Sequence, residues 1–152
     1  MSRNNCNAAA PHWPPRLSGT LRPPRTPLWD NLATSARRYP DKTAIRFFDR
    51  ALSYRDLIAD CETLAAWLSS AGIRAGDRVL VMMQNCPQLV TAHYAIMRAN
   101  AVVVPINPMN KAAELGHYIQ DSGAKAAICS AELAREISQA NDALPAGQQL
   151  QR

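Results

Sequence analysis

The sequence predicts an α/β fold with a mainly parallel sheet flanked by helices. Three short apolar runs, at residues 78–83, 101–104 and 125–129, each have the length of a strand. Two longer segments between them, 87–99 and 111–122, carry apolar residues at helical spacing. Strands that are apolar on both faces and are joined by helices are typical of a parallel sheet, because the crossover helices cover both of its faces. This stretch is expected to organise the rest of the chain.

The length and charge of the chain limit the classes of protein to which it can belong. The chain has 152 residues, enough for one domain of ordinary size. No apolar run approaches the roughly 20 residues that span a bilayer. The net charge of +5 is uneven, because residues 1–28 hold four arginines and no acid and leave only +1 for the remainder. The excess of basic residues therefore lies in the N-terminal tail and does not indicate a nucleic-acid-binding face.

Composition divides the chain into three parts. Residues 1–25 are rich in Pro, Arg, Asn and Ala, and we expect them to be flexible because they bury too little apolar surface to offset their ordering entropy. They lack the apolar core of a secretory signal, and their prolines disfavour the amphipathic helix of a mitochondrial presequence. Residues 26–144 are expected to form a partial domain, and residues 145–152 a short, truncated tail.

Two helices are expected ahead of the apolar stretch. The first begins at Thr26 and Pro27, a capping hydroxyl followed by proline at the first helical position. The second begins at Ser53, with Asp56 three residues later as in a capping box. Its apolar face runs through 57, 61, 64 and 68, and Gly72 ends it in a left-handed conformation.

The remaining elements are a hairpin between these two helices and a helix near the C-terminus. A strand over 43–48 is expected to pair with a short strand over 51–53 through a turn at 49–50. Ser130 is expected to cap the last helix, which runs through residues 133, 134 and 137.

The four cysteines, Cys6, Cys61, Cys86 and Cys129, form no C-x-x-C pair and match no zinc-binding spacing. Cys61 and Cys129 fall on apolar positions and are expected to be buried free thiols in a reducing compartment, the cytoplasm. Cys86 precedes a proline at a helix start, where a thiolate can be stabilised. No adjacent base is evident, so a nucleophilic role for it is the weaker alternative.

Candidate ligand-binding positions follow from topology, because the chain contains no Gly-rich phosphate loop, H-E-x-x-H or G-x-S-x-G motif. Ligands of an open parallel sheet bind beyond the carboxyl ends of its strands. Loops 84–86 and 105–110 leave such ends and lead into helix N-termini, which favour anions. The simpler interpretation is that Asn85, or Cys86 beside it, and Asn110 only cap their own helices. Likewise His93 is expected to be a packed core residue rather than a ligand or base.

The order and spacing of several segments resemble the N-terminal part of the adenylate-forming ligases, and more narrowly the bacterial long-chain fatty-acid–CoA ligases. The resemblance covers roughly residues 12–150, and no single motif carries it. One departure is Asn100, where these ligases commonly place Gly; Asn tolerates the same left-handed turn. The segments are LWDNLATSARRYPDKTAI (28–45), LSYRDL (52–57), AGIRAGDRVLVMMQNCPQ (71–88) and ANAVVVPINPMNKAAELGHYIQDSGAKAAI (99–128), with His12-Trp13-Pro14-Pro15 before them.

The resemblance implies a two-step reaction, in which a carboxylate and Mg-ATP give an acyl-adenylate and the thiol of CoA then displaces AMP. It implies ATP, Mg and CoA for the whole ligase. In that family the phosphate-binding loop, the Mg-binding Glu, the ribose-binding Asp and the catalytic Lys lie further along the chain. No catalytic, cofactor-binding or metal-binding residue is therefore carried over to residues 1–152, and none of these groups is expected to be bound by this portion.

Two hypotheses follow. The first is an N-terminal fragment of an acyl-CoA ligase, inactive alone, with a sheet that is incomplete at its C-terminal side and with the remainder of the ligase as its partner. The second is a non-catalytic α/β interaction module that binds a partner chain through the exposed sheet edge. A third hypothesis, nucleic-acid binding through the arginine-bearing tail, has less support than these two, because no aromatic residues are interleaved with the arginines.

Overall fold

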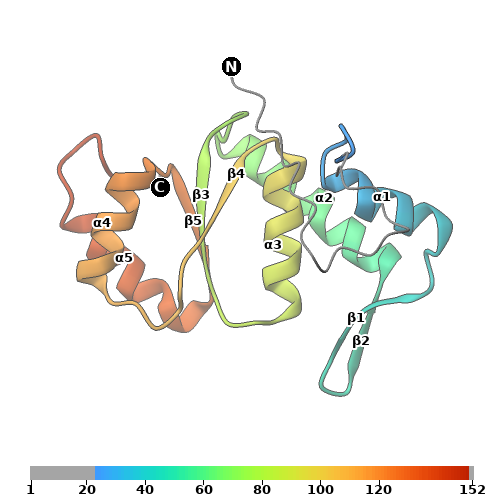
Figure 1. Ribbon diagram of the computed structural model, residues 1–152. Helices are drawn as coiled ribbons and strands as arrows, with labels where there is room; N and C mark the ends of the chain where they lie inside the picture. The colour runs from blue at the N-terminus through green and yellow to red at the C-terminus, as the bar shows by residue number, and fades with distance from the viewer. Residues whose placement is uncertain (1–22, 151–152) are drawn as a thin grey trace, which may run out of the picture.

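The computed structural model describes residues 23–150, which form three layers. A three-stranded parallel sheet in the order β4-β3-β5 lies in the middle, with α2 and α3 on one face and α4 and α5 on the other (Figure 1). The predicted α/β fold with a parallel sheet between helices is confirmed. In chain order the elements are α1 (Trp29–Arg38), β1 (Thr43–Phe47), β2 (Arg50–Ser53), α2 (Tyr54–Ser70), β3 (Arg78–Met82), α3 (Pro87–Arg98), β4 (Val102–Pro105), α4 (Ala112–Ser122), β5 (Ala126–Cys129), the short 3-10 helix η1 (Ala131–Leu133) and α5 (Ala134–Asp142).

The strand order explains why the helices divide between two faces. The chain steps from β3 to β4 on one side, then passes back across β3 to place β5 on the other side. Crossovers between parallel strands are right-handed, so two steps in opposite directions put α3 and α4 on opposite faces of the sheet. Within residues 23–150, no helix combines the length and the apolar character that crossing a membrane requires.

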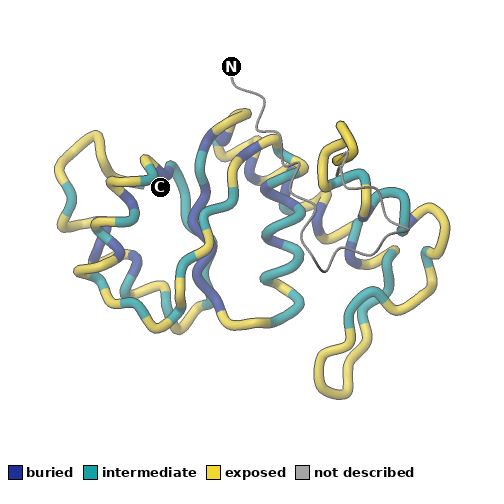
Figure 2. Tube along the Cα trace, viewed as in Figure 1, coloured by how far each residue is buried: buried dark blue, intermediate teal, exposed yellow. Residues whose placement is uncertain are grey.

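The central strand β3 is buried on both faces. Val79, Leu80, Val81 and Met82 are each at most 1% exposed, and the strand forms the dark core of the molecule in Figure 2. Because successive side chains of a strand point to opposite faces, this one strand supplies both major apolar clusters.

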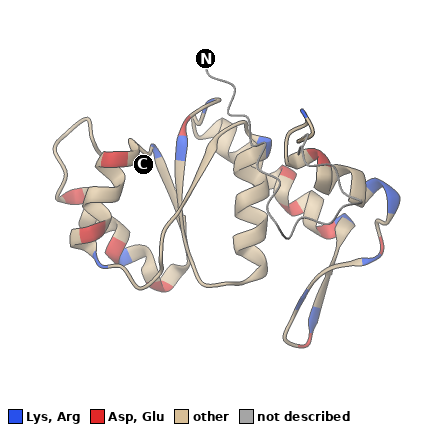
Figure 3. Ribbon diagram, in the orientation of Figure 1, with Lys and Arg blue, Asp and Glu red and all other residues tan. Residues whose placement is uncertain are grey.

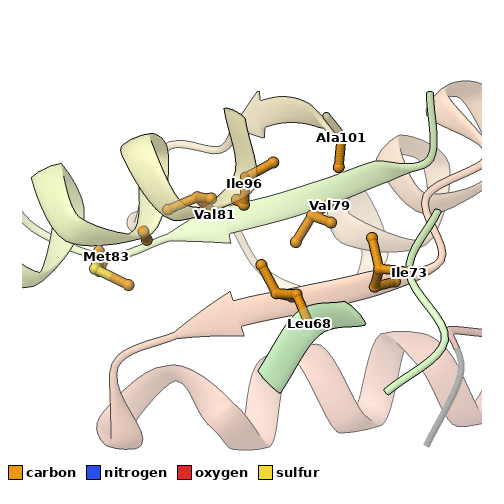
Figure 4. Packing of buried hydrophobic residues seen from close by; sticks show 8 residues of the cluster. Leu68, Ile73, Val79, Val81, Met83, Ile96 and Ala101 are labelled. Carbon is orange, nitrogen blue, oxygen red and sulfur yellow. The ribbon is translucent and has the colours of Figure 1, made fainter. Parts of the chain in front are cut away.

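The first cluster lies between the sheet and helices α2 and α3, and Figure 4 shows its side chains converging on β3. Its buried members are Leu68, Ile73, Val79, Val81, Met83, Ala92, Ile96 and Ala101. The second cluster lies between the opposite face and helices α4 and α5. Its buried members are Leu80, Met82, Leu115, Ile119, Ala124, Ile137 and Ala140. A smaller third cluster, built on Leu32, Leu57 and Cys61, joins α1 and the β1–β2 hairpin to α2.

Local signals correctly predicted several helix ends. The Ser53 hydroxyl accepts the Asp56 N–H at 3.1 Å, as the capping box requires. Gly72 is left-handed, with φ of 91°. Asn100 likewise adopts φ of 57°, and the Ala101 N–H returns to the Ile96 carbonyl at 3.0 Å. This is the bond that closes a Schellman motif after a helix.

Three other boundaries were predicted wrongly. Helix α1 begins at Trp29 after Leu28, not at Thr26 and Pro27, because a tighter turn comes first, in which the Asp30 N–H donates to the Pro27 carbonyl at 3.0 Å. The hairpin turn occupies residues 48–49 instead of 49–50. Phe47 pairs with Arg50, which leaves Phe48 at φ of 52°, an unfavourable conformation for an aromatic residue.

Ser130 does not cap α5 with its side chain. It precedes η1, where the Leu133 N–H donates to the Ser130 backbone carbonyl at 3.0 Å, and α5 begins only at Ala134. The backbone thus closes this turn without the hydroxyl. Of the predicted flexible segment 1–25 and the tail 145–152, residues 1–22 and 151–152 lie outside the described part of the chain.

Polar contacts hold the amino end of β3. Asp77 is 7% exposed and accepts the Lys125 ammonium at 2.9 Å and the Arg74 N–H at 2.8 Å. The Lys125 hydrogen bond, followed by that of Arg74, lowers the pKa of the Asp77 carboxyl. The Arg78 guanidinium donates to the Ser122 carbonyl at 2.7 Å. These bonds join β3 to the turn between α4 and β5.

Replacing Asp77 with Asn should change how stability depends on pH. The folded pKa of Asp77 is below its unfolded value, so the charged form stabilises the fold above about pH 4 and this contribution is lost as pH falls through the folded pKa. The unmodified chain should therefore lose more stability between about pH 5 and pH 3 than D77N, and D77N should melt lower at pH 7. Thermal unfolding followed by circular dichroism measures both. If the stability of D77N and that of the unmodified chain changed equally with pH, the Asp77 carboxylate would not stabilise the fold. The control is D41N, which alters an exposed ion pair with Arg55.

Replacing Leu80 with Ala should destabilise the fold by about 2–5 kcal/mol, because it removes buried methyl groups and leaves a cavity beside β3. The matched control is Val102→Ala on the edge strand β4, where the side chain is 46% exposed and the expected loss is about 0.5 kcal/mol. Urea unfolding compares the two variants. Equal losses would mean that β3 is not the strand on which the packing depends.

Candidate functional site

The carboxyl end of the sheet holds a crevice between β3 and β5. The chain leaves β3 toward α3 and leaves β5 toward α5, and these helices lie on opposite faces (Figure 1). Neighbouring strands whose connections diverge in this way open a crevice, the usual ligand position in such sheets. A cavity of about 420 Å³ lies here, with Leu64, Met83, Ala92 and Ile128 among its apolar lining residues.

The polar groups of this cavity do not suit an anion. Asp60 is the one charged residue that lines it, and Gln88, Thr91 and Ser130 contribute neutral groups. Charged residues lie mostly on the helices and the hairpin, and β4 and β5 contain none (Figure 3). A phosphate or carboxylate would meet the Asp60 charge without a compensating cation, so the crevice favours an apolar group.

The N-terminus of α3, at the end of loop 84–86, adds little to anion binding. Cys86 occupies the cap position, one of the two residues expected there, but its side chain makes no capping hydrogen bond and neither does that of Asn85. Pro87 follows at the first helical position and has no N–H. Cys86 also lines the cavity.

The N-terminus of α4 is closed by the chain's own carboxylates. The Lys111 N–H donates to Glu114 at 3.0 Å, and the Ala112 N–H donates to Glu136 of α5 at 3.1 Å. The Lys111 ammonium lies 3.5 Å from the other oxygen of Glu136. These carboxylates complement the positive end of the helix dipole where an external anion would bind.

The expected cap at Asn110 was therefore wrong. Lys111 occupies the cap position, and the Asn110 amide donates instead to the Tyr118 hydroxyl at 3.1 Å. Glu114 follows Lys111 at the spacing of a capping box, so the sequence contained a signal for the contact between them. Glu136 comes from 24 residues further along, and no local pattern identifies it as a partner of this helix.

The phosphates of ATP and its Mg ion do not fit these two loops. Among residues 23–150 no group of three or more His, Cys, Asp or Glu side chains could hold a metal ion. Neither helix N-terminus presents a cation and free N–H groups together. These two loops therefore offer no ligand set for Mg and no counter-charge for the phosphates of ATP.

Burial raises the pKa of two cysteine thiols. Cys61 is fully buried and donates to the Thr91 carbonyl at 3.6 Å; desolvation, then the charges of Asp60 and Glu62, raise its pKa to about 12. Cys129 is half-buried, and burial raises the pKa of its thiol too. The expected burial is confirmed for Cys61 and partial for Cys129, while Cys6 lies outside the described residues.

Cys86 and Cys129 both line the cavity but pack against different apolar clusters, on opposite faces of β3. Both are free thiols.

His93 makes a local contact within α3. Its Nδ1 lies 2.9 Å from the Leu89 carbonyl oxygen, which can only accept, so this ring nitrogen carries the proton. The ring is half-buried. The contact supports the structural interpretation of His93 over a role as ligand or base.

Comparison with known proteins agrees with the fold. The family described as AMP-binding enzyme matches residues 32–151. A long-chain-fatty-acid–CoA ligase of Bacillus subtilis is 39% identical over 110 residues, which are 72% of this chain and 20% of that protein. A salicyl-AMP ligase/salicyl-S-ArCP synthetase of Mycobacterium tuberculosis is 36% identical over 121 residues, which are 76% of this chain and 20% of that protein.

Solved structures lead to the same group. The Mycobacterium tuberculosis fatty acyl CoA synthetase superposes with a TM-score of 0.71 at 30% identity, covering 80% of this chain and 25% of that one. The chain spans about a fifth of the length of the curated relatives described above. Their similarity therefore concerns one portion of a larger enzyme.

Replacing Glu136 with Ala should destabilise the protein by about 1 kcal/mol, because the Ala112 N–H loses its acceptor and the helix dipole its counter-charge. Glu136→Gln should lose less, since the amide oxygen still accepts. Arg135→Ala, at the exposed neighbouring position, is the control and should change little. Urea unfolding ranks the three variants. A Glu136→Ala chain as stable as the control would show that this carboxylate does not close the helix end.

Proposed function

Because the chain belongs to the family of AMP-binding enzymes, we propose that it forms the N-terminal part of an ATP-dependent acyl-CoA ligase. The observation that carries the proposal is the match of residues 32–151 to that family, together with relatives named as long-chain-fatty-acid–CoA ligases. The class of reaction is the activation of a carboxylic acid by ATP and its transfer to the thiol of CoA.

The proposed reaction has two balanced steps. A carboxylate oxygen of the acid bonds to the α-phosphorus of ATP, and the bond to pyrophosphate breaks, which gives an acyl-adenylate. The CoA sulfur, having lost its proton, then bonds to the acyl carbon, and AMP leaves. We assign a fatty acid as the substrate on the strength of the fatty-acid ligases among the relatives; the salicyl-AMP ligase makes an aryl acid the competing choice.

The role of this portion within the ligase is structural. Its sheet and helices provide a framework, and the crevice at the sheet's carboxyl end is apolar. The N-terminus of α4 is occupied by Glu114 and Glu136, and neither loop suits ATP phosphates. We propose that residues 1–152 alone are catalytically inactive and that ATP, Mg and CoA bind to the remainder of the ligase. The free thiols of Cys61, Cys86 and Cys129 in the described part of the chain support a reducing compartment such as the cytoplasm.

A non-catalytic interaction module is the second candidate. The observation that favours it is the outer edge of β5, to which no further strand is paired in residues 23–150. A module of this kind would fold cooperatively as a 152-residue monomer, whereas a ligase portion that needs its remainder would unfold broadly or aggregate. Sedimentation and thermal unfolding distinguish the two.

The proposal predicts that the purified chain does not catalyse ATP–pyrophosphate exchange with fatty acids. A chimera in which residues 32–151 replace the matching segment of the Bacillus subtilis ligase should catalyse the exchange and form acyl-CoA. The controls are the unmodified Bacillus enzyme and the same enzyme without that segment. Exchange by the chain alone would overturn its proposed inactivity, and a folded chimera without ligase activity would overturn its proposed place in the enzyme.

A further inference from the structure

The β1–β2 hairpin projects from the body of the molecule and carries an aromatic pair at its tip (Figure 1). Phe47 is 37% exposed, and Phe48, in the turn, is 86% exposed. Their rings meet edge to face, with centroids 4.6 Å apart. Within residues 23–150 neither ring belongs to an apolar cluster. The tip of the hairpin therefore presents apolar surface to solvent.

Phe48 occupies this position in an unfavourable backbone conformation. Its φ is 52°, in the left-handed region that favours Gly and Asn and disfavours bulky residues. Two-residue hairpin turns commonly place Gly at this first central position. The fold thus gains little from Phe48 beyond its contact with Phe47. An exposed aromatic residue that is kept under backbone strain indicates a role outside the packing of the chain.

Positive charge surrounds the aromatic pair. Residues 37–55, from the end of α1 through the hairpin, hold six basic and two acidic residues and so carry +4. Residues 56–150 hold six basic and nine acidic residues and so carry −3. The basic segment lies at the end of the molecule formed by α1 and the hairpin, away from α4 and α5 (Figure 3). The charge of the chain is therefore polarised toward the hairpin.

Arg46 and Arg50 stand on either side of the hairpin turn, and both are exposed. The register pairs Arg50 with Phe47 and Arg46 with Ala51. Because cross-strand partners share a face, one arginine lies on each face of the hairpin. Among the ion pairs of the described residues, none involves either arginine. Asp49 is the one acid in the hairpin sequence, so the tip keeps a positive charge.

We infer that the hairpin tip is a docking surface for the anionic face of a lipid bilayer. Phe48 enters the boundary between headgroups and acyl chains, and Arg46 and Arg50 contact the lipid phosphates. The inference goes beyond the proposed ligase function and does not rest on it. The contact is peripheral, because only the tip of the hairpin meets the lipid.

Three features select a bilayer as the occupant. Phenylalanine has no polar group, so its transfer into the acyl boundary removes apolar surface from water without an unpaired donor. Guanidinium groups form charge-assisted hydrogen bonds with phosphates, and basic residues are attracted to anionic membranes. A projecting tip meets a flat surface, whereas single-stranded nucleic acid needs a basic groove with open ring faces. Here the edge of one ring already covers the face of the other.

Co-sedimentation of the 152-residue chain with phosphatidylcholine vesicles that contain about 30% phosphatidylglycerol tests the inference. The chain should bind them at least about tenfold more tightly than pure phosphatidylcholine vesicles, and added salt should weaken binding by screening the arginines. Phe48→Gly should weaken binding at least about tenfold, because the inserted ring is lost. The fold should persist, since Gly suits the positive φ, and circular dichroism checks this.

The arginines are tested by the double variant Arg46→Gln/Arg50→Gln, which should also weaken binding at least about tenfold and reduce its salt dependence. Two controls lie away from the hairpin. Trp67 is 58% exposed and lies about 20 Å along α2 from its hairpin end, and Arg135 is exposed on α5. Trp67→Ser and Arg135→Gln should each change binding less than about threefold, because both sites lie more than a Debye length from the tip.

Binding to anionic vesicles that F48G and the double arginine variant both weaken supports the inference. No binding, or equal binding to neutral vesicles, would overturn it. Binding that F48G leaves unchanged would also overturn it, because the four arginines of residues 1–28 would then suffice. A single-stranded DNA oligonucleotide that binds more tightly than the vesicles and is released by the double arginine variant would assign the surface to nucleic acid instead.

The chimera that carries residues 32–151 in the Bacillus subtilis ligase provides a second measurement if the chain alone aggregates. It excludes the arginines of residues 1–28, so F48G within it isolates the hairpin. F48G should reduce binding of the chimera to anionic vesicles at least about threefold. Equal binding by the two chimeras would overturn the inference, because the remainder of the ligase would then cover the tip or bind lipid itself. An inactive chimera whose vesicle binding depends on Phe48 would contradict the proposed ligase function and support the docking surface.

Discussion

The burial of β3 on both faces is the constraint on which the rest of the structure depends. One strand of five residues supplies side chains to the cluster under α2 and α3 and to the cluster under α4 and α5. Two right-handed crossovers that step in opposite directions along the sheet cover both of its faces with helices from a single chain. The helices therefore lie where the strand order puts them, and α1 with the hairpin is added outside α2 through a smaller cluster.

The two ends of the sheet serve different purposes. At the amino end, Asp77 and Arg78 bind Lys125 and the last turn of α4, so that polar groups hold the strands in register. At the carboxyl end, where enzymes of this architecture usually bind ligands, the crevice is apolar and the α4 terminus is occupied by Glu136. This distribution is consistent with the proposed structural role of residues 1–152.

The sequence predicted what depends on neighbours in the chain. Apolar runs identified the strands, and Ser53, Gly72 and Asn100 each marked a helix end, because a capping hydroxyl or a left-handed turn acts within a few residues. It failed where a more distant group decided the outcome. Asn110 looked like a cap, but its amide bonds to Tyr118, and Glu136 reaches α4 from another helix. Phe48 at positive φ was missed because the register of the strand pair, not the preference of the residue, determines its conformation.

Within residues 23–150 the fold is built around β3, and no further strand pairs with the outer edge of β5. The chain spans about a fifth of the length of the curated relatives that it matches. Residue-resolved hydrogen exchange of the 152-residue chain tests whether β3 alone holds the fold together. We expect the amides of Leu80, Val81 and Met82 to exchange last, and only through global unfolding. Rapid exchange at these amides while α2 remains protected would contradict it, because the helices would then persist without the central strand.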